Sequence, residues 1–193
     1  MLIIGGLTPF TTIDYPGKLA AVIFCQGCPW RCGYCHNQHL LPINRQGAVA
    51  WQEVLQLLEQ RRGLLDAVVF SGGEPTMQPS LPEAIAEVRS MGFLTGLHTG
   101  GAYPERLEAC LPHLDWVGMD LKAPFDLYDA ITGVAGSGAA AERSAVILRK
   151  SGVAHQFRTT LDPTLQTGGG IERLQQMVAG WGCNLLLQQL LVR

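Results

Sequence analysis

The chain has 193 residues, of which 47% are hydrophobic and 16% are charged, and its formal net charge is -2. This composition describes one globular domain over residues 1–193 and excludes the basic surface that a nucleic-acid-binding protein needs. No apolar run reaches the ~18 residues of a membrane span, and the N-terminus lacks the charged start and long apolar run of a signal peptide, so we expect a cytoplasmic protein without membrane association.

Short apolar runs alternate along the chain with longer segments of helical period, a pattern typical of βα units on a parallel sheet. Strands are expected at residues 19–24, 67–70, 94–97, 116–120, 156–160 and 185–188. Helices are expected between them, with apolar faces formed by Trp51, Val54, Leu55 and Leu58; Leu81, Ile85 and Val88; Leu107, Cys110, Leu111 and Leu114; Val146 and Ile147; and Leu174, Met177 and Val178. The glycine-rich residues 133–138 are expected to form a flexible loop.

The number of βα units predicts the fold class. A closed eight-unit barrel takes about 250 residues, so six units in this chain predict an α/β fold of the incomplete (β/α)6 barrel type, in a single domain. Such a barrel is open on one side, and the opening would admit a large partner.

The most informative motif is Cys-x3-Cys-x2-Cys, formed by Cys28, Cys32 and Cys35. Three thiolates on one tight loop can hold three corners of a cubane 4Fe-4S cluster. A cluster built only for electron storage normally has a cysteine on each iron, and no fourth cysteine stands at a matching distance downstream. The spacing therefore predicts a cluster with one iron free to bind and reduce a ligand.

Cys25 allows a different interpretation, because it pairs with Cys28 as Cys-x2-Cys ahead of a second such pair, as in zinc sites. Zinc sites of that type usually separate their pairs by a dozen or more residues, whereas here only three intervene. Cys25 also ends an apolar run, so we place it in the core and leave it out of the metal site. We expect Cys110 and Cys183 to be small buried hydrophobic residues.

Polar or small residues follow each expected strand, and in barrels of this kind the chemistry lies at the carboxyl ends of the strands. The first strand leads to the cysteine loop. The later strand ends carry Ser71-Gly72-Gly73-Glu74-Pro75, His98-Thr99-Gly100-Gly101, Asp120-Leu121-Lys122, Arg158 and Gln188. We expect these residues to surround a single cleft.

The cysteine motif, with Tyr34 before its last cysteine, and the Gly-Gly-Glu-Pro motif at residues 72–75 resemble the radical S-adenosylmethionine (radical SAM) superfamily over nearly the whole chain. Three further motifs, Asp-Tyr-Pro-Gly-Lys at residues 14–18, Cys-His-Asn at 35–37 and Asp-Leu-Lys at 120–122, resemble the glycyl-radical-enzyme activases. In size and in its opening residues the chain is most similar to the activating proteins of anaerobic ribonucleoside-triphosphate reductase.

This resemblance implies two cofactors, a 4Fe-4S cluster ligated by Cys28, Cys32 and Cys35 and S-adenosylmethionine bound at the open iron. The implied contacts to S-adenosylmethionine are Tyr34, Cys35, His36, Gly72, Gly73, Glu74, Thr99, Asp120, Lys122 and Arg158. Residues 34–36 would lie along the adenine through their backbone, and Glu74 would hold the amino group. Asp120 and Lys122, with Thr99, would contact the ribose and the carboxylate.

The implied reaction is reductive cleavage of S-adenosylmethionine to a 5'-deoxyadenosyl radical, which takes a hydrogen atom from a glycine of a partner enzyme. The resemblance makes that partner anaerobic ribonucleoside-triphosphate reductase and the electron donor flavodoxin or ferredoxin.

Two departures from the activase pattern are visible. His98-Thr99-Gly100-Gly101 replaces the Asp-Thr-Asn-Gly run common in the family, and the chain ends with residues 190–193 where relatives carry a further short tail. Two alternatives stay open. One is a radical SAM enzyme acting on a small molecule, similar to the 7-carboxy-7-deazaguanine synthases, and the other is a non-enzymatic zinc-binding module that uses Cys25 with the three motif cysteines.

Overall fold

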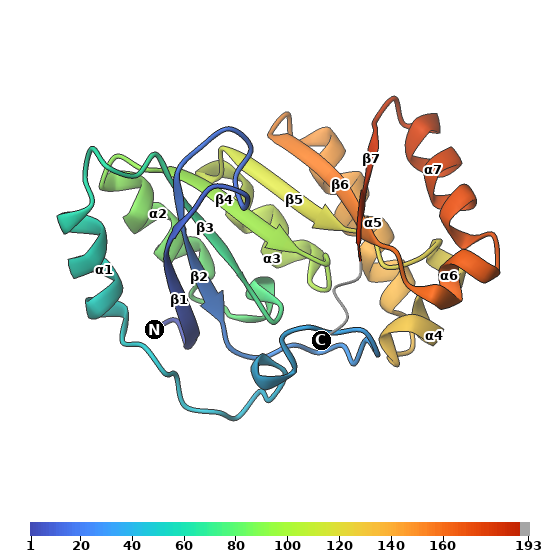
Figure 1. Ribbon diagram of the computed structural model, residues 1–193, viewed down its shortest axis with the longest axis horizontal. Coiled ribbons are helices and arrows are strands. Elements are labelled where there is room, and N and C mark those ends of the chain that lie inside the picture. Colours follow the sequence, from blue (N-terminus) through green and yellow to red (C-terminus); the bar gives the residue numbers. More distant parts are fainter. Residues whose placement is uncertain (190–193) are drawn as a thin grey trace.

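The computed structural model describes residues 1–189, so the expectation concerning residues 190–193 lies outside the described residues. The fold is one sheet of seven strands, arranged in space in the same order as in the sequence (Figure 1). The strands are β1 (Ile4–Thr11), β2 (Ala20–Cys25), β3 (Ala67–Gly72), β4 (Leu94–Thr99), β5 (Trp116–Asp120), β6 (Ala154–Thr160) and β7 (Leu185–Gln188). Strands β2 to β7 are parallel, and β1 is antiparallel to β2.

The sheet is not closed, because β1 and β7 pair on one side only and form its two edges. The six expected strands are all present, and the expected incomplete barrel is confirmed. Strand β1 is an addition that the sequence analysis missed. Its sequence includes Gly5, Gly6 and Pro9, residues that are depleted in strands, so the β pattern is weak there.

The α-helices are α1 (Trp51–Gln60), α2 (Leu81–Ser90), α3 (Pro104–Cys110), α4 (Tyr128–Thr132), α5 (Ser137–Lys150), α6 (Pro163–Thr167) and α7 (Gly170–Gly180). Four short 3-10 segments join them in the described chain, η1 (Gln38–Leu40), η2 (Pro75–Met77), η3 (Leu111–His113) and η4 (Phe125–Leu127). Within residues 1–189, no helix is both long and apolar enough to cross a bilayer.

Most of the expected helical faces are buried as predicted, but α5 differs. Its buried face is made of Ala141, Ser144, Ala145 and Leu148, whereas Val146 is 39% exposed. Small side chains let this helix approach the sheet closely. Because they are only weakly hydrophobic, the hydrophobic pattern of the sequence does not mark them as the buried face of α5. The expected flexible loop is also shorter than predicted, because α5 already begins at Ser137.

The two faces of the sheet have separate cores. The helix-facing side of the sheet packs against α1, α2, α3, α5 and α7 in one large cluster. The concave side holds a small cluster near the amino ends of the strands, where Tyr15, from the turn between β1 and β2, lies against Trp116 with ring centroids 5.4 Å apart. These side chains fill the concave side near the amino ends of the strands.

Candidate active site

A cavity of about 400 Å³ opens at the carboxyl ends of the strands, within the size range of small-molecule sites. The structure places every sequence-predicted site residue on its wall. These residues are Cys28, Cys32, Tyr34, Cys35, His36, Gly72, Gly73, Glu74, Thr99, Asp120, Lys122 and Arg158. Side chains that are up to 130 positions apart in the sequence, Cys28 and Arg158, therefore share one site.

The cysteine loop follows β2 and is fixed by its backbone. The amide of Gly27 donates to the carbonyl oxygen of Leu40 at 2.8 Å, and the Arg31 guanidinium donates to that of Cys28 at 2.7 Å. Burial, helped by the nearby charge of Glu74, raises the pKa of Cys28 to about 12, and burial also raises the pKa of Cys32. Because a metal binds the thiolate, a metal bound here must displace the protons of both thiols.

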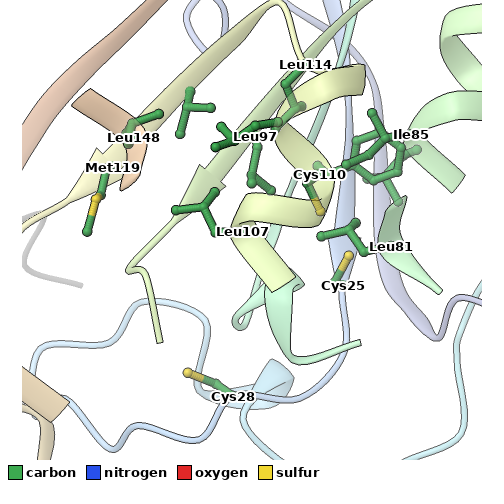
Figure 2. Close-up of a cluster of buried hydrophobic side chains, with 14 of the residues drawn as sticks. Cys25, Cys28, Leu81, Ile85, Leu97, Leu107, Cys110, Leu114, Met119 and Leu148 are labelled. Carbon is green, nitrogen blue, oxygen red and sulfur yellow. The ribbon is translucent and has the colours of Figure 1, made fainter. Parts of the chain in front are cut away.

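Cys25 lies apart from this loop. Figure 2 shows it beside Leu81 and Cys110, on the helix-facing side of the sheet and away from Cys28. Cys25 is fully buried, and burial raises its pKa. Across residues 1–189, no three His, Cys, Asp or Glu side chains, the three motif cysteines included, stand close enough to share a single metal ion. The zinc-module interpretation needs Cys25 among the ligands, and the structure places Cys25 in the core rather than on the cavity wall with the other three cysteines.

The other two cysteines pack as small apolar side chains. Cys110 is fully buried in the large core, as predicted. Cys183 is only partly buried and packs against the edge of the same core, so the expectation of full burial was wrong for this residue.

Gly72 and Gly73 allow the end of β3 to pack closely against the start of the cysteine loop. Gly72 has a φ of +120°, and a Cβ placed on it would lie 2.4 Å from the backbone nitrogen of Cys25. A Cβ on Gly73 would lie 2.2 Å from the carbonyl oxygen of Gly27. These glycines therefore let β3 approach the backbone of residues 25–27. This close contact holds the start of the cysteine loop at the cavity wall.

Glu74 is a buried carboxylate held by neighbouring donors. Its Oε1 accepts hydrogen bonds from the amide and the hydroxyl of Thr76 at 3.1 and 2.5 Å and from the Thr99 hydroxyl at 2.6 Å. Its Oε2 accepts one from the amide of Gly100 at 2.8 Å. Burial raises the pKa of Glu74, and these hydrogen bonds oppose the rise. Oε2 retains acceptor capacity for a ligand, whereas Oε1 joins the ends of β3 and β4.

Asp120, Lys122 and Arg158 form a charged group in the same cavity, and Lys122 Nζ lies 5.9 Å from the centre of the Tyr34 ring in the cysteine loop. Asp120 Oδ1 accepts from Arg158 Nε at 2.8 Å, and its Oδ2 lies 3.4 Å from Lys122 Nζ. Burial opposes the charge on Asp120, but Arg158 and Lys122 outweigh it and lower its pKa. Burial likewise acts against the charge on Lys122, and Asp120 and Tyr34 reverse that effect and raise its pKa. The pKa shifts of Asp120 and Lys122 both favour their charged forms.

His98 lies on the cavity wall, as expected of the residues at the strand ends, and it contacts Asp14, which the sequence analysis did not place at the site. His98 Nε2 lies 2.8 Å from the carbonyl oxygen of Asp14 and 3.1 Å from Arg158 Nη1. The carbonyl only accepts and the guanidinium only donates, so this nitrogen can satisfy one of them at a time. Burial, with the charge of Arg158, lowers the pKa of His98 to about 4 and keeps the ring neutral. Asp14 could have been anticipated only by recognising β1, which carries it to the cavity.

The side chains present fit the cofactors that the sequence implies. The three thiols share the cavity with the cations of Lys122 and Arg158 and the carboxylates of Glu74 and Asp120, a set that suits an iron-sulfur cluster beside a zwitterionic ligand. Tyr34 adds a buried hydroxyl that has no hydrogen-bond partner among the described residues, and burial raises its pKa to about 12. A buried hydroxyl without a partner is costly unless a bound molecule satisfies it.

Comparisons with known proteins agree with this geometry. Residues 22–177 match the sequence model of the Radical SAM superfamily. A protein of Methanocaldococcus jannaschii, whose name assigns it provisionally to the glycyl-radical enzyme activating enzymes, is 31% identical over 183 residues, which cover 91% of this chain and 75% of that protein. The pyruvate formate-lyase-activating enzyme of Clostridium pasteurianum is 34% identical over 127 residues, 63% of this chain. The chain spans about half of that enzyme, since the match covers 53% of it.

The fold is also similar to solved structures. The structure of SuiB from Streptococcus suis, bound to the precursor peptide SuiA, matches with a TM-score of 0.69 and 16% identity over 88% of this chain and 39% of that chain. At this identity the likeness concerns the fold alone.

Proposed function

Because the chain belongs to the radical SAM superfamily and, within it, to the glycyl-radical-enzyme activating enzymes, we propose that it generates a glycyl radical on anaerobic ribonucleoside-triphosphate reductase. Enzymes of this superfamily use a 4Fe-4S cluster and S-adenosylmethionine. The observation that carries the proposal is that the cysteine loop and the Asp120–Lys122 turn line one cavity.

In this proposal the cluster is held by Cys28, Cys32 and Cys35, and S-adenosylmethionine lies between them and the charged group. The residues assigned to S-adenosylmethionine are Tyr34, Cys35, His36, Gly72, Gly73, Glu74, Thr99, Asp120, Lys122 and Arg158. When bound, the two cofactors supply one-electron cleavage of a carbon-sulfur bond and a 5'-deoxyadenosyl radical that abstracts hydrogen.

In this proposal the protein's side chains bind and orient S-adenosylmethionine. Lys122 is a partly buried cation that can neutralise a carboxylate as a point charge. Asp120 pairs with Lys122 through one carboxylate oxygen and with Arg158 through the other. The free acceptor capacity of Glu74 Oε2 suits an ammonium group. These charges are set in place before the ligand arrives, which avoids reorganisation during the reaction.

The open sheet supports a protein substrate rather than a small enclosed one. In the described chain the edge strands β1 and β7 do not pair with each other, and the exposed side chain of Ile13 lines the cavity. A peptide segment of a partner enzyme could reach the cavity by this side, with flavodoxin or ferredoxin as the electron donor.

The test is direct. The reconstituted protein is mixed anaerobically with S-adenosylmethionine, reduced flavodoxin and either anaerobic ribonucleoside-triphosphate reductase or pyruvate formate-lyase. We expect the glycyl radical doublet in paramagnetic resonance spectra with the reductase. A doublet only with pyruvate formate-lyase would contradict the choice of partner. Release of 5'-deoxyadenosine only with a small pterin substrate would contradict glycyl radical activation altogether.

A further inference from the structure

Helix α4 contacts both the cysteine loop and the Asp120–Lys122 turn. Figure 1 shows the loop after β2 running along the carboxyl end of the sheet toward α4. The helix has five residues, begins at Tyr128 and ends at Thr132. Neither residue was singled out by the sequence, and neither lines the cavity. Each nevertheless bonds to a segment that does.

The first contact ties α4 to the charged group. The Tyr128 hydroxyl accepts a hydrogen bond from the backbone amide of Lys122 at 2.9 Å and lies 3.5 Å from the carbonyl oxygen of Asp120. The hydroxyl therefore contacts the backbone at both ends of the Asp-Leu-Lys tripeptide. Tyr128 is completely buried, and burial raises its pKa, so the phenol stays neutral and keeps both its donor and its acceptor.

The second contact ties α4 to the cysteine loop. The rings of Trp30 and Tyr128 meet edge to face, with centroids 5.8 Å apart and planes at 73°. The amide of Arg31 donates to the carbonyl oxygen of Thr132 at 2.7 Å. Both loop residues lie between Cys28 and Cys32, so the position of α4 bears directly on the spacing of the cysteines.

Gly100 fixes the other side of Trp30. A Cβ on Gly100 would lie 2.3 Å from the Trp30 ring, so the indole rests directly on this glycine. The activase run Asp-Thr-Asn-Gly has asparagine where this chain has Gly100, and the indole occupies the space that such a side chain would need. The Trp30 ring therefore packs between Gly100, after the end of β4, and Tyr128 of α4.

We propose that Trp30 and Tyr128 form a positioning unit that couples the cysteine loop to the Asp120–Lys122 turn, so that these two parts of the cavity lining keep one relative geometry. The unit touches no reacting atom and acts through Lys122 on one side and the cysteines on the other. The inference rests on the proposed function, since it takes Lys122 to bind S-adenosylmethionine.

The experiment compares Tyr128→Phe with Tyr103→Phe, a matched loss of a hydroxyl away from the cavity, in the reconstituted holoenzyme. The probe is S-adenosylmethionine, and its affinity is followed by the change it produces in the spectrum of the reduced cluster. Loss of the hydrogen bond to the Lys122 amide is expected to weaken binding about fivefold. Iron content and the spectrum at saturation should stay unchanged, and Tyr103→Phe should bind as wild type does.

Gly100→Ala tests the same unit from the Trp30 side, with Gly180→Ala as its control because open space surrounds that glycine. If the two sites act through one unit, the double variant Tyr128→Phe/Gly100→Ala will bind more tightly than the product of the two single losses predicts. Wild-type affinity in Tyr128→Phe, or strictly independent losses in the double variant, would overturn the inference. Failure of the wild type itself to bind S-adenosylmethionine would instead overturn the proposed function.

Discussion

At the scale of single residues, the site depends on buried charges that the protein has already paired. Asp120 lies between Arg158 and Lys122, and these two cations lower its pKa. Arg158 is buried and the other two are partly buried, so removing one member leaves its partner charged and shielded from water, which costs more than the loss of an exposed ion pair. The thiols differ, because burial keeps Cys28 and Cys32 protonated until a metal binds.

The assignment of ligands predicts opposite results for two cysteines that are three positions apart in the motif region. Cys28→Ala should abolish iron binding after reconstitution, because it removes one of three thiolates facing the cavity. Cys25→Ala, in the core, should keep the full iron content and lose only about 1 kcal/mol of stability. Iron and acid-labile sulfide analysis checks both, and equal iron loss in the two variants would contradict the assignment.

Lys122 is expected to contribute through its charge. Lys122→Met keeps the length of the side chain but removes the cation, and we expect S-adenosylmethionine to bind at least tenfold more weakly, since hydrogen bonds to charged groups are worth about 1.5–3 kcal/mol. Equilibrium dialysis with the reconstituted protein measures this. The control is Lys150→Met, at the exposed end of α5, which should bind normally; a matching loss there would point to a general effect of charge.

His98 predicts a pH dependence of stability. Its pKa is lowered to about 4 from an ordinary value near 6.5, so the unfolded chain binds more protons than the folded one between these values. The stability from the neutral ring is complete above about pH 6.5 and is lost as the pH falls toward 4. The free energy of unfolding of the metal-free protein should therefore fall more steeply over this range in wild type than in His98→Gln. Parallel curves would contradict the burial of a neutral ring.

At the scale of secondary structure, close backbone approaches place the site. The end of β3 can lie against the start of the cysteine loop only because two successive residues have no side chain, and Gly72 also has a positive φ. Hydrogen bonds from Gly73 to Cys25 and from Glu74 to Gly27 then fix the contact at 3.0 and 2.8 Å. The Gly-Gly-Glu-Pro motif is therefore a structural joint as well as part of the cavity wall.

This close contact predicts that alanine substitution destabilises the protein much more at Gly72 than at Gly63, although both glycines have a positive φ. Gly72→Ala combines backbone strain with a clash against Cys25 and should destabilise the protein by roughly 3 kcal/mol or more. Gly63→Ala has a φ of +75° but open space, so it should cost only about 1 kcal/mol. Chemical denaturation distinguishes them, and equal costs would show that the contact with Cys25 is not tight.

The elements that sequence analysis found and missed differ in physical signal. Strands β2, β3 and β5 are largely apolar runs, and the glycines and polar groups at the strand ends mark the site, so both could be predicted. Strand β1 lacks such a run because of Gly5, Gly6 and Pro9, and α5 buries small side chains that carry little hydrophobic signal. Tyr128 and Trp30 act through geometry that no spacing in the sequence encodes.

At the scale of the whole molecule, an unclosed sheet carries its cavity at one end and an accessible side between its edges. The turn that carries Tyr15 packs against Trp116 near the amino ends of the strands. The cavity lies at the opposite end of the sheet, next to the cysteine loop. The parts that form this end come from almost the full length of the described chain, which is why the site exists only in the folded domain.

The most direct test of this account is a titration of the reduced, reconstituted protein with S-adenosylmethionine, followed by paramagnetic resonance of the cluster. With three cysteine ligands and one iron open to the cavity, the account predicts a cluster signal that changes shape and saturates near one equivalent. A signal that stays the same throughout the titration, from a cluster with a cysteine on every iron, would contradict it.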